Sequence, residues 1–285
     1  MIRALRCLLV SIAACGLGSC SLDRLAYDHL DFLARHYVSG FVDLRPTQQQ
    51  AFDQAFDRLW RWHRSSELPR YASAVRRLAA VFQTAQTPQR IDQELSTLDQ
   101  FGTPLSQHLL GELAPLLTLL DDRQVAQILK EVDRRIDKSA KRAAKLDDAH
   151  WRSHEFDQAS DQIEKYVGPL QTAQQQQLRS WSQTLTRDPA LTRRAAEAWR
   201  RRFAEVLQRR HESGHAERVQ DLVATSDPAI AAFERRRATS RARYVALLAE
   251  LSGTYTPPQR QHLQTSLNAL AVDMDSLAAE VPASK

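Results

Sequence analysis

Residues 105–136 read LSQHLLGELAPLLTLLDDRQVAQILKEVDRRI, and their apolar positions recur at intervals of three and four residues. That interval is the period of a helix that buries one face. The same spacing extends outward along the chain from Leu30 to Leu277, and no stretch shows the sustained alternation of a strand. We therefore predict an all-α fold of about ten amphipathic helices packed as a multi-helix bundle.

The composition restricts the class of protein further. The chain has 285 residues, of which 43% are hydrophobic and 26% charged, and only eight are glycine. This mixture excludes a disordered, collagen-like or multi-span membrane chain. The scarcity of glycine argues against an all-β fold, and the sequence contains no phosphate-binding loop, Rossmann glycine pattern or Gly-x-Ser-x-Gly elbow.

The first twenty residues have the pattern of a lipoprotein signal. Arg3 and Arg6 precede an apolar run over 7–15, which is too short to span a bilayer and has the length of a secretory signal's apolar region. The run leads to Leu-Gly-Ser before Cys20, which resembles the bacterial lipobox. We expect 1–19 to be a cleaved signal peptide and Cys20 to carry lipid.

Cleavage before Cys20 has consequences for chemistry and location. Cys7 and Cys15 leave with the signal, so the mature chain has neither a disulfide nor a cysteine nucleophile. Ser21, in place of Asp, favours the outer membrane. We expect a periplasm-facing lipoprotein that is attached to the membrane through its lipid and binds no nucleic acid.

Four helix starts share a pattern in which glutamine lies four residues after an apolar residue. Residues 44–48 read LRPTQ and 170–174 read LQTAQ, with looser versions at 120–124 (LDDRQ) and 255–259 (YTPPQ). One interpretation is a duplication, with two tandem four-helix halves at 46–169 and 170–285 behind a segment, 20–45, that holds the lipidated cysteine and a leader helix over 22–40. The other is that capping chemistry selects similar residues at any helix start.

Helix starts are also predicted where a capping side chain precedes proline, which loses no hydrogen bond in the first helical turn. The stretch 122–167 is either one long helix or two helices that meet near Asp147. The predicted capping pairs are Thr87-Pro88, Thr103-Pro104, Asp188-Pro189, Asp227-Pro228 and Thr256-Pro257.

Several segments resemble a family of uncharacterised bacterial lipoproteins, in which a lipobox precedes an all-helical domain of unknown function. They are Leu30-Asp31-Phe32-Leu33, Val42-Asp43-Leu44, Trp62-His63-Arg64 and Glu67-Leu68-Pro69-Arg70-Tyr71-Ala72. The resemblance implies a helical fold and an envelope location, and it implies no reaction. The glutamine-bearing helix starts are similar to the LTxxQ signature of periplasmic stress chaperones, but Arg45, Asp121 and Gln171 replace its threonine.

Two histidine pairs are candidate metal ligands. His211-Glu212-x-x-His215 matches the zinc pattern H-E-x-x-H, although charged flanks favour a solvated helix. His150 and His154 have helical spacing and are interpreted as a surface pair. We expect no metal and no cofactor. His63 lies at a core-facing position and is predicted to be a buried core histidine.

Residues 193–243 hold thirteen arginines against seven acidic residues. Helical spacing places Arg202 with Arg209, and Arg237 with Arg241, as candidates for binding an anionic lipid or an acidic envelope protein. The alternative is that nearby carboxylates neutralise them.

These observations favour a non-enzymatic function. The leading hypothesis is a membrane-anchored envelope lipoprotein that acts as a binding or assembly factor. The second is a holdase-like periplasmic chaperone, and the third is a metal-dependent hydrolase that uses His211, Glu212 and His215.

Cys20→Ala is expected to abolish acylation and membrane fractionation while leaving the helical fold intact. Acyl chains supply roughly 0.8 kcal/mol of membrane affinity per buried CH₂ group, and this variant has none. Mass spectrometry and flotation of membranes washed in high salt measure both effects. A variant that still floats contradicts the lipid anchor.

Overall fold

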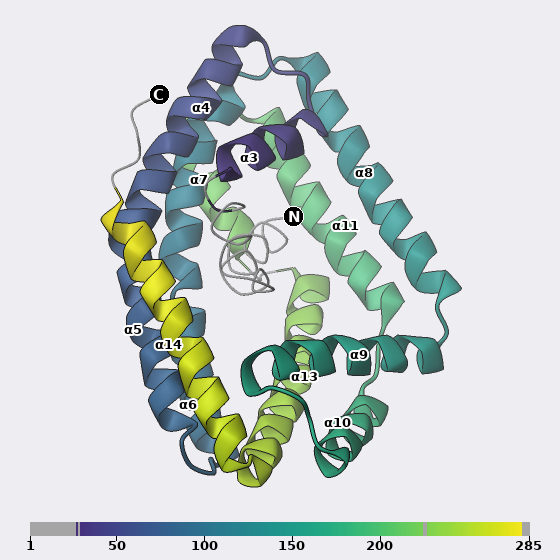
Figure 1. Ribbon diagram of the computed structural model, residues 1–285. Coiled ribbons are helices and arrows are strands. Elements are labelled where there is room, and N and C mark those ends of the chain that lie inside the picture. The colour runs from purple at the N-terminus through teal and green to yellow at the C-terminus, as the bar shows by residue number, and fades with distance from the viewer. Residues whose placement is uncertain (1–26, 28, 225–226, 281–285) are drawn as a thin grey trace. The chain divides into compact units, whose positions relative to one another are not determined.

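The computed structural model describes residues 27, 29–224 and 227–280 (Figure 1). The predicted signal peptide 1–19 and Cys20 lie outside the described residues. Within the described part the regular elements are all helical and there is no strand, which confirms the all-α prediction. The chain divides into two compact units, each assembled from three separate segments.

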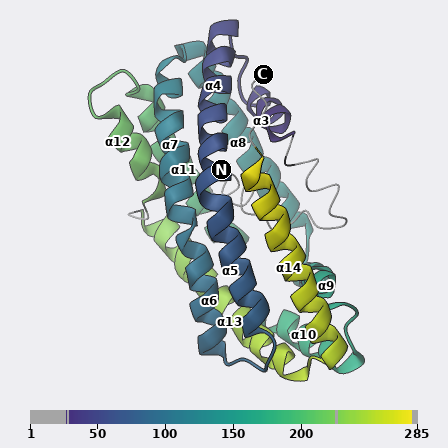
Figure 2. The ribbon, with the colours of Figure 1, turned by 60° about the vertical axis from the view of Figure 1, so that its left-hand side comes forward.

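Unit 1 comprises the described residues up to Trp62 together with Gly102–Lys145 and Asp188–Glu234. Its core is apolar and joins α7, α8, α11 and α12, with Phe41 and Val42 from the segment after α3. Helix α4 packs on α7, α8 on α11, and α12 on α7 (Figures 1 and 2). The elements are α3 (Leu30–Ser39), α4 (Pro46–Trp62), α7 (Gly102–Thr118), α8 (Asp122–Lys145), α11 (Pro189–Gln208), α12 (His215–Gln220), the 3-10 helix η2 (Asp221–Val223) and the first residues of α13 (Pro228–Thr254).

Unit 2 comprises His63–Phe101, Leu146–Arg187 and the residues from Arg235 onward. Its most extensive helix contact is between α5 and α14, which run side by side in Figure 2, while α9 packs on both α10 and α14. The elements are the π-helix η1 (His63–Glu67), α5 (Leu68–Val81), α6 (Pro88–Gln100), α9 (Asp148–Val167), α10 (Thr172–Thr184), the remainder of α13, and α14 (Pro257–Ala279).

The compact units follow different boundaries from the predicted halves 46–169 and 170–285. The predicted halves divide the sequence once, whereas the chain passes repeatedly from one unit to the other. Of the leader helix predicted over 22–40, the structure describes α3. The stretch 122–167 is two helices, α8 and α9, with the Asp147 side chain capping α9 by accepting a hydrogen bond from the His150 backbone N–H (2.8 Å).

Most of the predicted capping pairs do begin helices. One is wrong: α7 already begins at Gly102, so Thr103 is not its cap. Pro104 then occupies the first turn, where backbone N–H groups have no partner within the helix and a missing one costs nothing. The capping side chains that accept a backbone N–H as predicted belong to Thr87, Asp188, Asp227 and Thr256.

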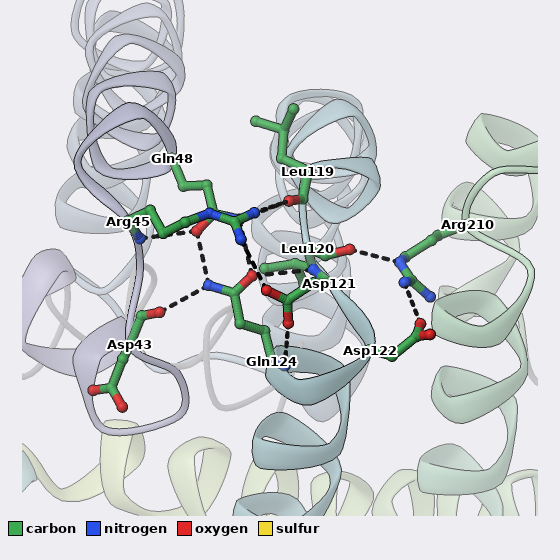
Figure 3. A network of polar contacts seen from close by, with 9 residues as sticks. All are labelled: Asp43, Arg45, Gln48, Leu119, Leu120, Asp121, Asp122, Gln124 and Arg210. Carbon is green, nitrogen blue, oxygen red and sulfur yellow. Dashed lines mark hydrogen bonds and ion pairs between the residues drawn. The ribbon is translucent and has the colours of Figure 1, made fainter.

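Two buried glutamines join the starts of α4 and α8 (Figure 3). The Gln48 amide nitrogen donates to the Gln124 side-chain oxygen (2.9 Å), and the Gln124 nitrogen donates back to the Gln48 oxygen (2.7 Å). We call this reciprocal pair an amide clasp. Its residues lie 76 positions apart in the sequence.

The clasp also ties each helix to the segment that precedes its partner. The Gln48 nitrogen donates to the Leu119 carbonyl (2.6 Å), and the Gln124 nitrogen donates to the Asp43 carbonyl (2.8 Å). Each side-chain oxygen accepts the backbone N–H three residues earlier, at 2.8 and 3.1 Å. Every donor and acceptor of both buried amides therefore has a partner, as burial of a polar group requires.

Unit 2 contains a second clasp with the same bonding pattern. Gln174 at the start of α10 and Gln259 at the start of α14 exchange hydrogen bonds of 3.0 and 2.9 Å. They donate to the carbonyls of Thr254 (3.1 Å) and Pro169 (2.9 Å), each five residues before the partner glutamine. Capping explains the bond from each amide to its own helix start, but it does not explain the reciprocal pairing.

Gln124→Ala is expected to lower the free energy of unfolding by about 2–4 kcal/mol, because the Gln48 amide and the Asp43 carbonyl lose buried partners. Gln50→Ala, at an exposed position on α4, is the control and is expected to change it by less than about 0.5 kcal/mol. Chemical denaturation measures both.

A double-mutant cycle over Gln48 and Gln124 tests the pairing itself. The two alanine substitutions are expected to be non-additive by about 1 kcal/mol or more, since either one alone already breaks the clasp. Additive effects would contradict a reciprocal bond.

Candidate functional site

The predicted zinc motif is not on a helix. His211–Gly214 lie in the turn between α11 and α12, and Gly214 adopts a left-handed conformation (φ 74°). His215, the first residue of α12, is buried and its Nε2 lies 3.0 Å from the Ala114 carbonyl oxygen. The two imidazoles therefore do not share a helix face, which the H-E-x-x-H geometry requires.

The second histidine pair lies on the surface of α9. The His150 Nδ1 is 2.7 Å from an Asp147 carboxylate oxygen, and both side chains are exposed. His154 is exposed one turn further along the same helix. Within the part of the chain that the structure describes, no group of three or more His, Cys, Asp or Glu side chains is arranged to hold a metal ion.

Two of the candidate arginines, Arg202 and Arg209, are already bonded within the protein. Arg202 reaches the backbone carbonyls of Ala224 and Asp221, and Arg209 pairs with Glu205 and Glu212. These two arginines belong to unit 1.

The other two candidates belong to unit 2. Arg241 of α13 forms ion pairs with Asp92 and Asp99 of α6, and Arg237 is exposed on α13. These acids come from another helix, which helical spacing along a single helix does not reveal. Anion binding by the four arginines stays a prediction.

An apolar cavity of about 170 Å³ lies inside unit 1. The cavity is partly open to the outside, and Leu119, one of its lining residues, is exposed. The polar groups of the lining residues are the Gln48 amide, which is fully used by the clasp, the Tyr37 hydroxyl and the Trp199 indole N–H. The other lining residues are Val38, Phe41, Val42, Leu44, Phe52, Leu109, Leu110, Leu113, Leu116, Leu117, Leu120, Ile128 and Phe203.

Three elements supply most of the cavity wall. Helix α7 contributes Leu109, Leu113 and Leu116, which follow one another at helical spacing and are half-buried. Trp199 and Phe203 of α11 stack with their ring centres 4.9 Å apart. The third element is α3 with the segment that follows it. A cavity of about 150 Å³ with such a lining stays dry and takes up benzene, so this one has room for an apolar group of that size.

A guanidinium lies against the aromatic rings of this wall. The Arg135 guanidinium carbon is 3.8 Å from the centre of the Phe41 ring and 5.2 Å from that of Tyr37, as in cation–π contacts. Both rings line the cavity. Gly40 permits this approach, because a Cβ there would lie 3.1 Å from an Arg135 nitrogen.

Arg135 also belongs to a group of charged side chains on α8. Arg134 and Arg135 both bond the carboxylate of Glu131, at 2.6 Å each, and these bonds lower the pKa of Glu131 to about 2. Two cations therefore share one carboxylate, and a net positive charge remains. The arrangement suits an apolar group that carries an anionic head.

Sequence reasoning did not find this cavity. The available signal was that leucines of α7 occupy more than one helical face: Leu105, Leu109, Leu110, Leu113, Leu116 and Leu117. Such a helix must contact apolar surroundings on several sides. Arg135 could not be singled out, because its role depends on rings from another segment.

His63 is buried, as predicted, with 3% of its surface exposed, and it begins the π-helix of unit 2. The ring of Tyr71 lies edge-on, with 5.6 Å between ring centres. Burial lowers the pKa of His63 to about 4 from its ordinary value of 6.5. The imidazole is therefore neutral in the folded protein at neutral pH.

Comparison with known proteins yields one family. The model of a family of unknown function, DUF6279, matches residues 40–230, which include both candidate-site helices α7 and α11. No curated protein and no solved structure matches the chain. No helix in the described part of the chain is long and apolar enough to cross a membrane.

The free energy of unfolding is expected to fall as the pH drops from 6.5 to about 4. In this range the unfolded protein binds a proton at His63 and the folded protein does not. Relative to wild type, His63→Phe is therefore expected to gain up to roughly 3 kcal/mol of unfolding free energy between pH 7 and pH 4. Denaturation across this range measures the difference.

His154→Gln, at an exposed position, is the matched control and should follow the wild-type curve. A constant difference between His63→Phe and wild type across this range would refute the pKa shift.

Proposed function

We propose a binding function for this chain, which belongs to the DUF6279 family of unknown function over residues 40–230. The proposal is a periplasm-facing lipoprotein, anchored to the bacterial outer membrane through Cys20, that binds an anionic lipid without converting it. The lipid's apolar end enters the cavity of unit 1, and its anionic head lies near Arg135.

The apolar cavity is the observation that carries this proposal. It is large enough for the end of an acyl chain or a ring. Removing apolar groups from water contributes about 0.8 kcal/mol per CH₂ group, which is the main source of affinity at such a site. The excess positive charge of Arg134 and Arg135 over Glu131 favours an anionic head over a neutral one.

The lining favours binding over catalysis. Gln48 has no free hydrogen-bonding capacity, because both its donors and both its acceptor positions are used by the clasp. The rest of the lining offers no nucleophile or general base beyond the Tyr37 hydroxyl. A hydrolase built on His211 and His215 has no support in the geometry of the turn between them.

The holdase alternative requires a broad apolar surface for unfolded chains. The large apolar side chains that are exposed in the described part of the protein are few and belong to several elements: Phe32, Leu33, Leu119, Val223 and Val272. The apolar residues of unit 1 that line the cavity suit the binding of one apolar group better than the binding of an unfolded chain.

Leu113→Trp is expected to weaken dodecanoate binding at least about tenfold, because the indole fills space that the ligand would occupy. The protein is the Cys20→Ala chain, which carries no acyl group of its own, and calorimetry measures the affinity. Leu270→Trp, at a half-buried leucine of α14 in unit 2, is the matched control. Equal affinities of the two variants would contradict the cavity as the binding site.

Arg135→Gln tests the preference for an anionic head. It is expected to reduce the affinity for dodecanoate about fivefold, the equivalent of about 1 kcal/mol for one cation near an anionic group. The affinity for dodecanol, which has the same tail without the charge, should stay unchanged. Equal losses for both ligands would assign Arg135 to packing alone.

A further inference from the structure

One face of α3, continued by the N-cap residue His29, is exposed. His29, Phe32, Leu33 and His36 are all exposed, and their spacing places them along a single side of the helix. Phe32 is 65% exposed and Leu33 42% exposed. We call these four residues the α3 stripe. It contains no Asp, Glu, Lys or Arg, whereas the exposed face of a surface helix is usually charged.

Other residues of α3 hold the helix against the rest of unit 1, so the direction of the stripe is set. Leu30 is buried, and Tyr37 and Val38 pack on the core and line the cavity. Arg35 donates to a carboxylate oxygen of Asp53 in α4 at 2.8 Å. The helix therefore cannot turn Phe32 inward without breaking these contacts.

The stripe also lies close to the proposed lipid anchor along the chain. Cys20 precedes His29 by nine residues. A segment of that length spans at most roughly 30 Å, since an extended chain advances about 3.5 Å per residue. α3 therefore stays near any bilayer that holds the acyl chains of Cys20.

We propose that the α3 stripe lies on the surface of the bilayer that holds the Cys20 anchor, with Phe32 and Leu33 inserted at the boundary between head groups and acyl chains. This inference rests on the lipid anchor of the proposed function. Helices with an apolar face bind membrane interfaces in this way, at a depth of about 5–10 Å. Insertion removes from water two large side chains that α3 otherwise leaves exposed.

This orientation brings the cavity near the membrane. Tyr37 and Val38, which belong to the same helix as the stripe, line the cavity. A helix with its side chains is about 10–12 Å across. A lipid that leaves the bilayer beside α3 therefore has a short path to the cavity, and the apolar group need not cross open water.

The test uses the acylated full mature protein on vesicles of phosphatidylethanolamine and phosphatidylglycerol. Because the anchor consumes Cys20, a single introduced cysteine can be labelled with an environment-sensitive fluorophore. Phe32→Cys reports on the stripe. Val272→Cys is the matched control, since Val272 is 59% exposed on α14. Far-UV spectra check that both variants fold.

The label at position 32 is expected to be quenched about threefold more strongly than the label at 272 by nitroxide-bearing lipids, because it lies within the lipid boundary region. Equal weak quenching at both positions, in protein whose mass shows the acyl chains, overturns the stripe and leaves the anchor in place. Protein that lacks the acyl mass overturns the anchor, and the stripe proposal falls with it.

Discussion

Two reciprocal amide pairs are the interaction on which the remaining structure depends. A helix start leaves backbone N–H groups without partners, and burying two such starts against each other is costly unless each polar group is satisfied. Gln48 and Gln124 meet this requirement for α4 and α8, and Gln174 and Gln259 meet it for α10 and α14. Each glutamine also donates a hydrogen bond to the segment that precedes its partner's helix, so one side chain sets the position of two chain segments.

The cavity of unit 1 follows from where the clasp places these segments. Gln48 belongs to the clasp and to the lining, and Leu44 and Leu120, four residues before the two glutamines, are lining residues as well. An empty apolar volume is unfavourable. Apolar side chains that line an unfilled space lose packing contacts, which costs free energy. A ligand that fills it recovers part of that free energy, which is the usual trade between stability and binding.

The helical fold could be predicted from the sequence, because the period of apolar residues and the capping side chains act locally. The predicted cap at Thr103 was wrong for a local reason as well, since α7 begins at Gly102, two residues before Pro104, and proline is tolerated in the first helical turn. The four glutamine helix starts were also visible. Their pairing was not, because it joins residues 76 and 85 positions apart. The same limit applies to Arg135 and its two rings, and to the acids on α6 that neutralise Arg241. His211 and His215 do not share a helix face, because Gly214 between them has a left-handed conformation that interrupts the helix. A spacing pattern does not reveal that conformation.

The interleaved order of the segments has a consequence for how the chain acquires its structure. Unit 2 needs residues from 63 onward and also the last helix, with Arg64 bonded to the Leu277 carbonyl and to Glu280 across 213 and 216 positions. Unit 1 likewise requires segments that are separated by parts of unit 2. Contacts this distant in sequence slow folding, because long loops must close before any packing is gained. Because synthesis begins at the N-terminus, unit 1 cannot be completed before residues 188–234 have emerged, and unit 2 cannot be completed before the residues from Arg235 onward have emerged. Apolar helix faces stay exposed until then, so the unfinished chain is the form most exposed to aggregation and proteolysis.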